Sequence, residues 1–142
     1  MLTKAQITDG FEKMINCSMQ VVREKAEELG LDKELGMRIA APFGGGMLRG
    51  DTCGAVTGAL ILIGMKYGHS NENDAENYRT VCEKATQFLE QFQARNKTLI
   101  CRELIGYDFS QGESEKAAES GIMIKKCPKL IQDALEILDD IL

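Results

Sequence analysis

The stretch that organises the fold runs from residue 43 to residue 67 and reads FGGGMLRGDTCGAVTGALILIGMKY. Its first eight residues hold four glycines, a composition used where the backbone needs left-handed dihedral angles or close approach to another segment. Two N-cap candidates follow, so we expect a helix that starts at Cys53 and ends near Tyr67. The apolar run over residues 55–65 is about half the length that crosses a bilayer and predicts a buried helix.

Apolar residues recur at helical spacing through the rest of the chain. The pattern predicts a long amphipathic helix over residues 2–29, ended by a glycine, and a short helix over 31–41, ended by a proline. Further helices are expected over 74–94, 99–105 and 112–120, and a last helix is expected to open at Cys127-Pro128. No segment alternates like a strand. We therefore predict an all-α single domain, a compact helical bundle of five to seven helices.

The charge balance excludes one broad class of function. The chain carries 17 Lys and Arg scattered among 22 Asp and Glu, with a net charge of −5. It has no basic stripe that would neutralise the phosphates of DNA or RNA, so no nucleic-acid partner is expected. The opening MLTKAQITDGFEKM lacks the apolar core and cleavage site of a signal peptide, which predicts a cytoplasmic protein that is not inserted in a membrane.

Five cysteines are more than a cytoplasmic protein of this size needs for packing. A reducing compartment makes stable structural disulfides unexpected, so the thiols need another explanation. The sequence contains no C-x-x-C pair, which excludes the thioredoxin motif and the usual zinc-finger spacings. Any cysteine site must therefore be assembled by the fold.

The positions of the cysteines are informative because a helix N-terminus stabilises a thiolate. Cys53, Cys101 and Cys127 are each expected at or near the start of a helix. Cys17 is expected in the middle of a helix, at the margin of its apolar stripe, where it could still reach a shared pocket. Cys82 has no glycine or cap beside it and is interpreted as a small core residue.

The glycine-rich segment supplies a second set of candidates. Gly44, Gly45 and Gly46 could form a backbone nest that binds an anion or a cofactor, although their spacing matches neither the dinucleotide fingerprint nor the P-loop. Arg49 could stabilise a thiolate at Cys53, and a solvated loop arginine is an equal alternative.

Four segments of the chain are recognisable together: Asn16-Cys17-Ser18, the run over residues 43–58, Cys101-Arg102-Glu103-Leu104-Ile105-Gly106, and Cys127-Pro128. They resemble the redox-active protein family named for its cysteine pattern, C_GCAxxG_C_C, although the central motif here reads Cys-Gly-Ala rather than Gly-Cys-Ala. The resemblance implies that residues 1–142 form one domain of this type. It also implies that the four signature cysteines are Cys17, Cys53, Cys101 and Cys127, which leaves Cys82 outside.

The function that the family name implies is limited to redox activity inferred from its cysteines, and a tendency of its genes to lie near transporter genes. We favour a thiol–disulfide oxidoreductase in which Cys53 attacks, a second signature cysteine resolves the mixed disulfide, and a redox partner exchanges electrons. The alternative is that the same four cysteines bind a [2Fe–2S] iron–sulfur cluster or, with less support, zinc or another metal. A non-enzymatic module that binds a membrane transporter, or a homo-oligomer, also stays open.

Overall fold

The computed structural model describes residues 1–142 and consists of helices, turns and a single isolated β-bridge. The eight α-helices are α1 (Lys4–Glu12), α2 (Cys17–Lys25), α3 (Lys33–Ala40), α4 (Gly54–Tyr67), α5 (Ala75–Asn96), α6 (Cys101–Ile105), α7 (Ser114–Ser120) and α8 (Ile122–Ile141). Three 3₁₀ turns join them, at Glu27–Leu29, Ala41–Phe43 and Phe109–Gln111. The predicted all-α class is confirmed.

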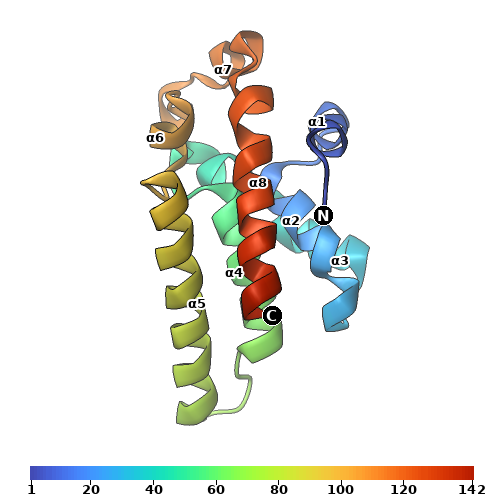
Figure 1. Ribbon diagram of the computed structural model, residues 1–142, viewed down its shortest axis with the longest axis vertical. Helices are drawn as coiled ribbons and strands as arrows, with labels where there is room; N and C mark the ends of the chain where they lie inside the picture. The colour runs from blue at the N-terminus through green and yellow to red at the C-terminus, as the bar shows by residue number, and fades with distance from the viewer.

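Helix α4 is the centre of the hydrophobic core, as its apolar sequence predicts. Five of its side chains have no exposed surface, namely Ala55, Val56, Ala59, Leu62 and Ile63. The helix contacts α2, α5 and α8, and Figure 1 shows α5 and α8 running side by side with α4 behind them. No helix in the structure combines the length and the apolar character needed to cross a membrane.

Glycines in α3 and α4 leave no side chain between these helices and α2, so that α2 packs closely against both. A Cβ atom added at Gly58 of α4 would lie 2.8 Å from the carbonyl oxygen of Ser18. A Cβ atom added at Gly36 of α3 would lie 2.9 Å from Cγ1 of Val22. Helix α2 is therefore held closely between α3 and α4, and this packing brings Cys17 to the start of α4.

The single helix predicted over residues 2–29 is wrong, because the chain breaks after Glu12. Met14 adopts a left-handed conformation with φ of 63°, which ends α1. The Asn16 side chain then accepts a hydrogen bond from the Met19 N–H at 3.0 Å and caps a new helix. Cys17 is consequently the first residue of α2 rather than a mid-helix residue. This division also explains why eight helices form where five to seven were expected.

The last helix begins earlier than the sequence predicts. Gly121, with φ of 70°, ends α7, and α8 starts at Ile122, so Cys127 and Pro128 lie inside the helix. Proline has no N–H to offer the carbonyl group four residues before it, which is why it usually marks a first turn. Here the preceding glycine sets the start of the helix, and the proline is tolerated within it and buried.

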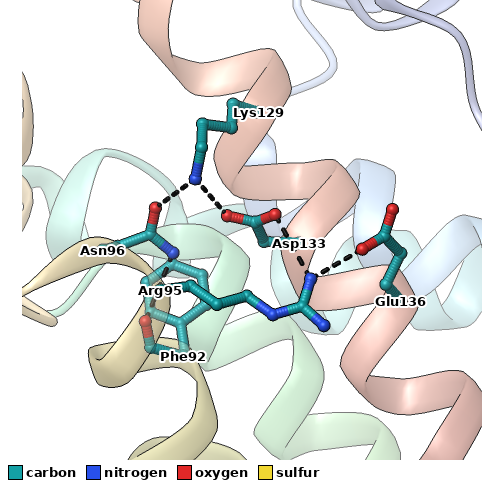
Figure 2. A network of polar contacts seen from close by, with 6 residues as sticks. All are labelled: Phe92, Arg95, Asn96, Lys129, Asp133 and Glu136. Atoms are coloured by element: carbon teal, nitrogen blue, oxygen red, sulfur yellow. Dashed lines mark hydrogen bonds and ion pairs between the residues drawn. The ribbon is translucent and has the colours of Figure 1, made fainter.

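A polar network fastens α8 to the end of α5, as Figure 2 shows. The mostly buried carboxylate of Asp133 accepts from Lys129 Nζ at 2.6 Å and from Arg95 Nη1 at 3.4 Å. Arg95 Nη1 also donates to Glu136 at 2.6 Å, and Lys129 Nζ donates to Asn96 Oδ1 at 2.9 Å. Because α5 leads into Cys101 and α8 carries Cys127, the network fixes the relative position of these two cysteine-bearing segments.

Candidate functional site

Four cysteines from four different segments line one pocket of about 460 Å³. Cys17 opens α2, Cys53 is the N-cap of α4, Cys101 opens α6, and Cys127 lies in the second turn of α8. Apolar side chains fill most of the remaining wall, among them Phe11, Ile15, Leu104, Ile105, Phe109 and Leu130. The fold therefore gathers the four cysteines that the sequence singles out.

A two-residue β-bridge sets the relative positions of Cys53 and Cys101. Thr52 pairs antiparallel with Ile100, so the segments before α4 and α6 run alongside each other. The Cys53 N–H donates to the Leu99 carbonyl at 2.7 Å. On the other side, the Cys101 N–H donates to the Asp51 carbonyl at 2.6 Å. Because Cys53 and Cys101 both lie one residue from this pair, their side chains leave the bridge on the same face.

Arg102 fastens the same bridge from outside the pocket. Its Nη1 donates to the Asp51 carboxylate at 2.9 Å and to the Gly50 carbonyl at 3.2 Å. Asp51 and Thr52 are the two N-cap candidates of the sequence, but Cys53 is the N-cap of α4, without a side-chain cap hydrogen bond. Asp51 pairs with Arg102 instead. The arginine next to Cys101 thus holds the end of the glycine-rich segment in place.

The four thiols occupy a setting that disfavours the thiolate. Burial raises the pKa of all four, and for Cys101 it raises the pKa to about 12. The next largest contribution for Cys53, Cys101 and Cys127 is repulsion from an ionised Cys17, which raises each pKa further. Cys17 is therefore the sulfur to which the other three are most strongly coupled, and ionising one thiol opposes ionising the others.

Backbone amide groups oppose this effect at two of the sulfurs. The amides of Gly45, Ser18 and Gly54 lower the pKa of Cys17, although less than burial raises it. Those of Ala55 and Val56 act in the same way on Cys53. Cys53 does lie at a helix start, but the expectation that this position makes it a stabilised thiolate is not met, because desolvation outweighs the amides.

The glycines near the pocket are needed for close approach to the cysteines. A Cβ atom at Gly54 would overlap the Sγ atom of Cys17, and one at Gly44 would overlap the Asn16 side chain. A Cβ atom at Gly46 would lie 2.9 Å from the Cβ atom of Cys101. The glycine pattern thus brings the backbone to the cysteines, and Gly44 and Gly45 themselves line the pocket.

A left-handed turn, residues 45–48, forms one side of the pocket mouth. Gly45, Gly46, Met47 and Leu48 have φ values of 60°, 64°, 58° and 65°. Left-handed geometry is ordinary for glycine, but it costs a residue with a Cβ atom roughly 1–2 kcal/mol. The turn therefore stores backbone strain directly beside the cysteines.

Two candidates lie outside the pocket. Arg49 is exposed and does not line the wall, so it is not placed as a partner of Cys53. It lies instead near Asp108, whose pKa is lowered by its hydrogen bond to Ser110 and also by Arg102 and Arg49. Cys82 is exposed on α5, so its interpretation as a core residue is wrong. The inward stripe of α5 runs through Val81, Ala85, Phe88 and Phe92, one residue out of step with Cys82.

A comparison with protein families gives a match to this chain. A family model described as "Putative redox-active protein (C_GCAxxG_C_C)" matches residues 15–141. The chain belongs to the C_GCAxxG_C_C family. The matched region includes all four cysteines of the pocket, and the resemblance stated from the sequence is confirmed. No curated protein and no solved structure matches the chain significantly.

Several pocket residues could not be singled out from the sequence. Met14, Leu48 and Met123 line the wall, but each is an apolar residue that an amphipathic pattern assigns to packing. Asn16 did carry a signal, because an asparagine directly before a helix is a typical N-cap. Its Nδ2 also donates to the Ala41 carbonyl at 2.8 Å, so it links the start of α2 to the 3₁₀ turn that precedes the glycine-rich segment.

Proposed function

We propose that the protein performs reversible two-electron chemistry on the cysteine thiols of this pocket. The observation that carries the proposal is that four cysteines, contributed by four separate segments, line one pocket in a chain of a redox-active family. Cys82, the fifth cysteine, stands apart on the surface of α5. Packing alone does not explain why four of the five cysteines meet in one pocket, because cysteines that only fill space would be spread through the core.

Cys17 and Cys53 form the reactive pair in this proposal. The Sγ atom of Cys17 lies against Gly54, the residue after Cys53, and these two sulfurs are the ones that backbone amides face. In the oxidative direction two S–H bonds break and one S–S bond forms, so the pair releases two protons and two electrons to an acceptor. In the reverse direction two electrons and two protons restore the thiols.

A redox titration tests the proposal. The Cys82→Ser variant is equilibrated in dithiothreitol buffers of graded potential, and the remaining thiols are counted by alkylation and mass spectrometry. We expect one two-electron transition, which disappears when either Cys17 or Cys53 is replaced by Ser. If all four pocket thiols stayed available for alkylation at every potential, the proposal would be abandoned.

A second candidate function uses the same four sulfurs as ligands of a [2Fe–2S] cluster. No three His, Cys, Asp or Glu side chains are grouped so that they could hold one metal ion, which disfavours a zinc site. A binuclear cluster needs only two cysteines at each iron, and backbone amides that face Cys17 are the kind of donors that tune such clusters. Iron and acid-labile sulfide are assayed after purification without oxygen, and negligible amounts of both would remove this candidate.

A further inference from the structure

The wall of the cysteine pocket carries no charge. None of its 18 lining residues is Asp, Glu, Lys, Arg or His, and the polar members other than cysteine are Asn16 and Ser114. The Asn16 side chain already has hydrogen-bond partners within the protein, because it accepts from the Met19 N–H and donates to the Ala41 carbonyl. A charged group that entered this pocket would lose its hydration without gaining a partner.

Two arginines close to the cysteine-bearing segments, Arg102 and Arg49, are not part of the pocket wall. Arg102 is directed away from the wall to the Asp51 carboxylate and the Gly50 carbonyl. Arg49 is exposed and acts on Asp108, outside the pocket. A carboxylate or phosphate substrate would therefore find no counter-charge within the pocket.

The mouth of the pocket is also apolar, at a cost to stability. Met14 is 90% exposed and Leu48 is 65% exposed, and both line the pocket. Both also have left-handed backbones, with φ of 63° and 65°. An exposed, large hydrophobic residue in a strained backbone conformation is unfavourable for stability. The presence of two such residues at the mouth of one pocket indicates a role in binding.

We propose that the pocket admits an uncharged, apolar two-electron carrier of the quinone class, which exchanges electrons with the cysteine pair. The inference rests on the proposed thiol chemistry and names its small-molecule partner. The cavity of about 460 Å³ falls in the range that holds small-molecule ligands, and such sites are lined mainly by apolar side chains.

The reaction leaves no net charge in the pocket. Two thiols and one quinone give one disulfide and one hydroquinone, so both protons and both electrons pass from sulfur to the quinone oxygens. Burial keeps the thiols protonated, and they therefore supply protons together with electrons. Exchange with a charged disulfide such as glutathione disulfide would instead bring carboxylates against an apolar wall.

Oxidation by duroquinone tests the inference, because this quinone is uncharged and every ring position is substituted. The reduced Cys82→Ser protein is mixed with duroquinone or with glutathione disulfide, and the loss of thiols is followed against time. We expect one hydroquinone formed for every two thiols lost, at a rate well above that of glutathione disulfide. Equal rates with the two oxidants, or a rate no higher than that of a free small thiol with duroquinone, would overturn the inference.

A pair of neighbouring variants gives the matched control. Leu48→Asp places a charge at the mouth in a conformation that aspartate tolerates, and should slow oxidation by duroquinone at least about tenfold. Met47→Asp adds the same charge one residue away, in the same left-handed turn but outside the pocket lining, and should change the rate less than about twofold. Equal effects of the two variants would contradict the assignment of this pocket.

A binding measurement separates this inference from the proposed redox function. A variant with Ser at all four pocket cysteines has no thiol chemistry there, so only binding is observed. The uncharged dye N-phenyl-1-naphthylamine should bind saturably to it, duroquinone should displace the dye, and Leu48→Asp should abolish binding. If duroquinone displaces the dye but the protein with its four pocket cysteines shows no redox transition, the proposed function alone is rejected. If duroquinone does not displace the dye from the folded four-serine variant, the ligand class is rejected.

Discussion

Cys17 is the residue on which the electrostatics of the pocket depend most. The negative charge that Cys17 carries once it ionises is the largest Coulombic contribution to the raised pKa values of the other three pocket cysteines. Gly54 touches its sulfur and leaves no room for a Cβ atom. The sequence predicted that glycines bring the backbone close to this site and that the cysteines are grouped. It singled out Cys53, rather than Cys17, from its position at a helix start. That position does not reveal burial, which has the largest effect on the pKa values here.

Gly54→Ala should disturb this arrangement directly. The added methyl group collides with the Cys17 sulfur, and we expect a loss of about 1–3 kcal/mol in the free energy of unfolding together with a shifted redox midpoint. Gly64→Ala is the matched control in the same helix, because a Cβ atom there meets nothing within 4 Å. It should leave the midpoint unchanged and stabilise the helix by roughly 0.5–1 kcal/mol. Denaturant unfolding measures the free energy of unfolding, and redox titration measures the midpoint. Equal behaviour of the two variants would contradict the contact between Gly54 and the Cys17 sulfur.

The buried thiols should make the reduced protein sensitive to alkaline pH. The pKa of Cys101 is about 12 in the folded protein, against an ordinary value of 9.0. Between these values the folded state keeps a proton that the unfolded chain has lost, so stability is full below about pH 9 and falls as the pH rises. Cys101→Ala should weaken this fall in urea unfolding between pH 8 and pH 10, whereas Cys82→Ala, at an exposed position, should leave it unchanged. A pH dependence identical in all three proteins would argue against burial of the thiols.

At the scale of elements, the sequence predicts where helices lie better than where they end. The apolar repeat continues across residues 13–16 because α1 and α2 both face the core, so periodicity alone cannot show the break that Asn16 and Met14 create. The start of α8 was placed five residues too late, since the proline signal pointed to Cys127. Local backbone features, Met14 with the Asn16 cap in one case and Gly121 in the other, therefore set these helix ends.

The left-handed turn should respond to glycine in a way that an ordinary loop would not. Met47→Gly removes the strain of a left-handed residue with a Cβ atom, and we expect a gain of about 0.5–1 kcal/mol in the free energy of unfolding after the entropic cost of glycine. Arg49→Gly, at a neighbouring exposed position without a positive φ, should instead lose about 0.5–1 kcal/mol. Thermal and denaturant unfolding compare them, and destabilisation by both changes would show that the turn is not strained.

The network between α5 and α8 should contribute to stability through its buried carboxylate. Asp133→Ala leaves Arg95 and Lys129 without their shared partner, and we expect a loss of about 1.5–3 kcal/mol. Asp139→Ala, on the same helix, removes a pair with Lys25 in which the carboxylate is half-exposed, and should lose less than about 1 kcal/mol. Denaturant unfolding at two salt concentrations checks both values. A smaller loss of unfolding free energy for Asp133→Ala than for Asp139→Ala would show that the network does not stabilise the fold.

At the scale of the whole molecule, the sequence predicted an all-α fold centred on a buried α4, with four cysteines brought to one site. The helical periods and the small residues of α4 carry that information. The uncharged wall and the strained apolar mouth could not be predicted, because Met14, Leu48 and Phe109 meet only when α1, the left-handed turn and the segment after α6 come together. Pocket character is a property of the assembled chain.

The most direct test of the four-cysteine redox site is native mass spectrometry of the Cys82→Ser protein, purified without oxygen and measured before and after mild oxidation. The account predicts a bare chain that loses two hydrogens on oxidation, with the disulfide mapped to Cys17 and Cys53. A bound mass of iron and sulfide, or an oxidised sample in which all four pocket thiols remain free, would contradict it.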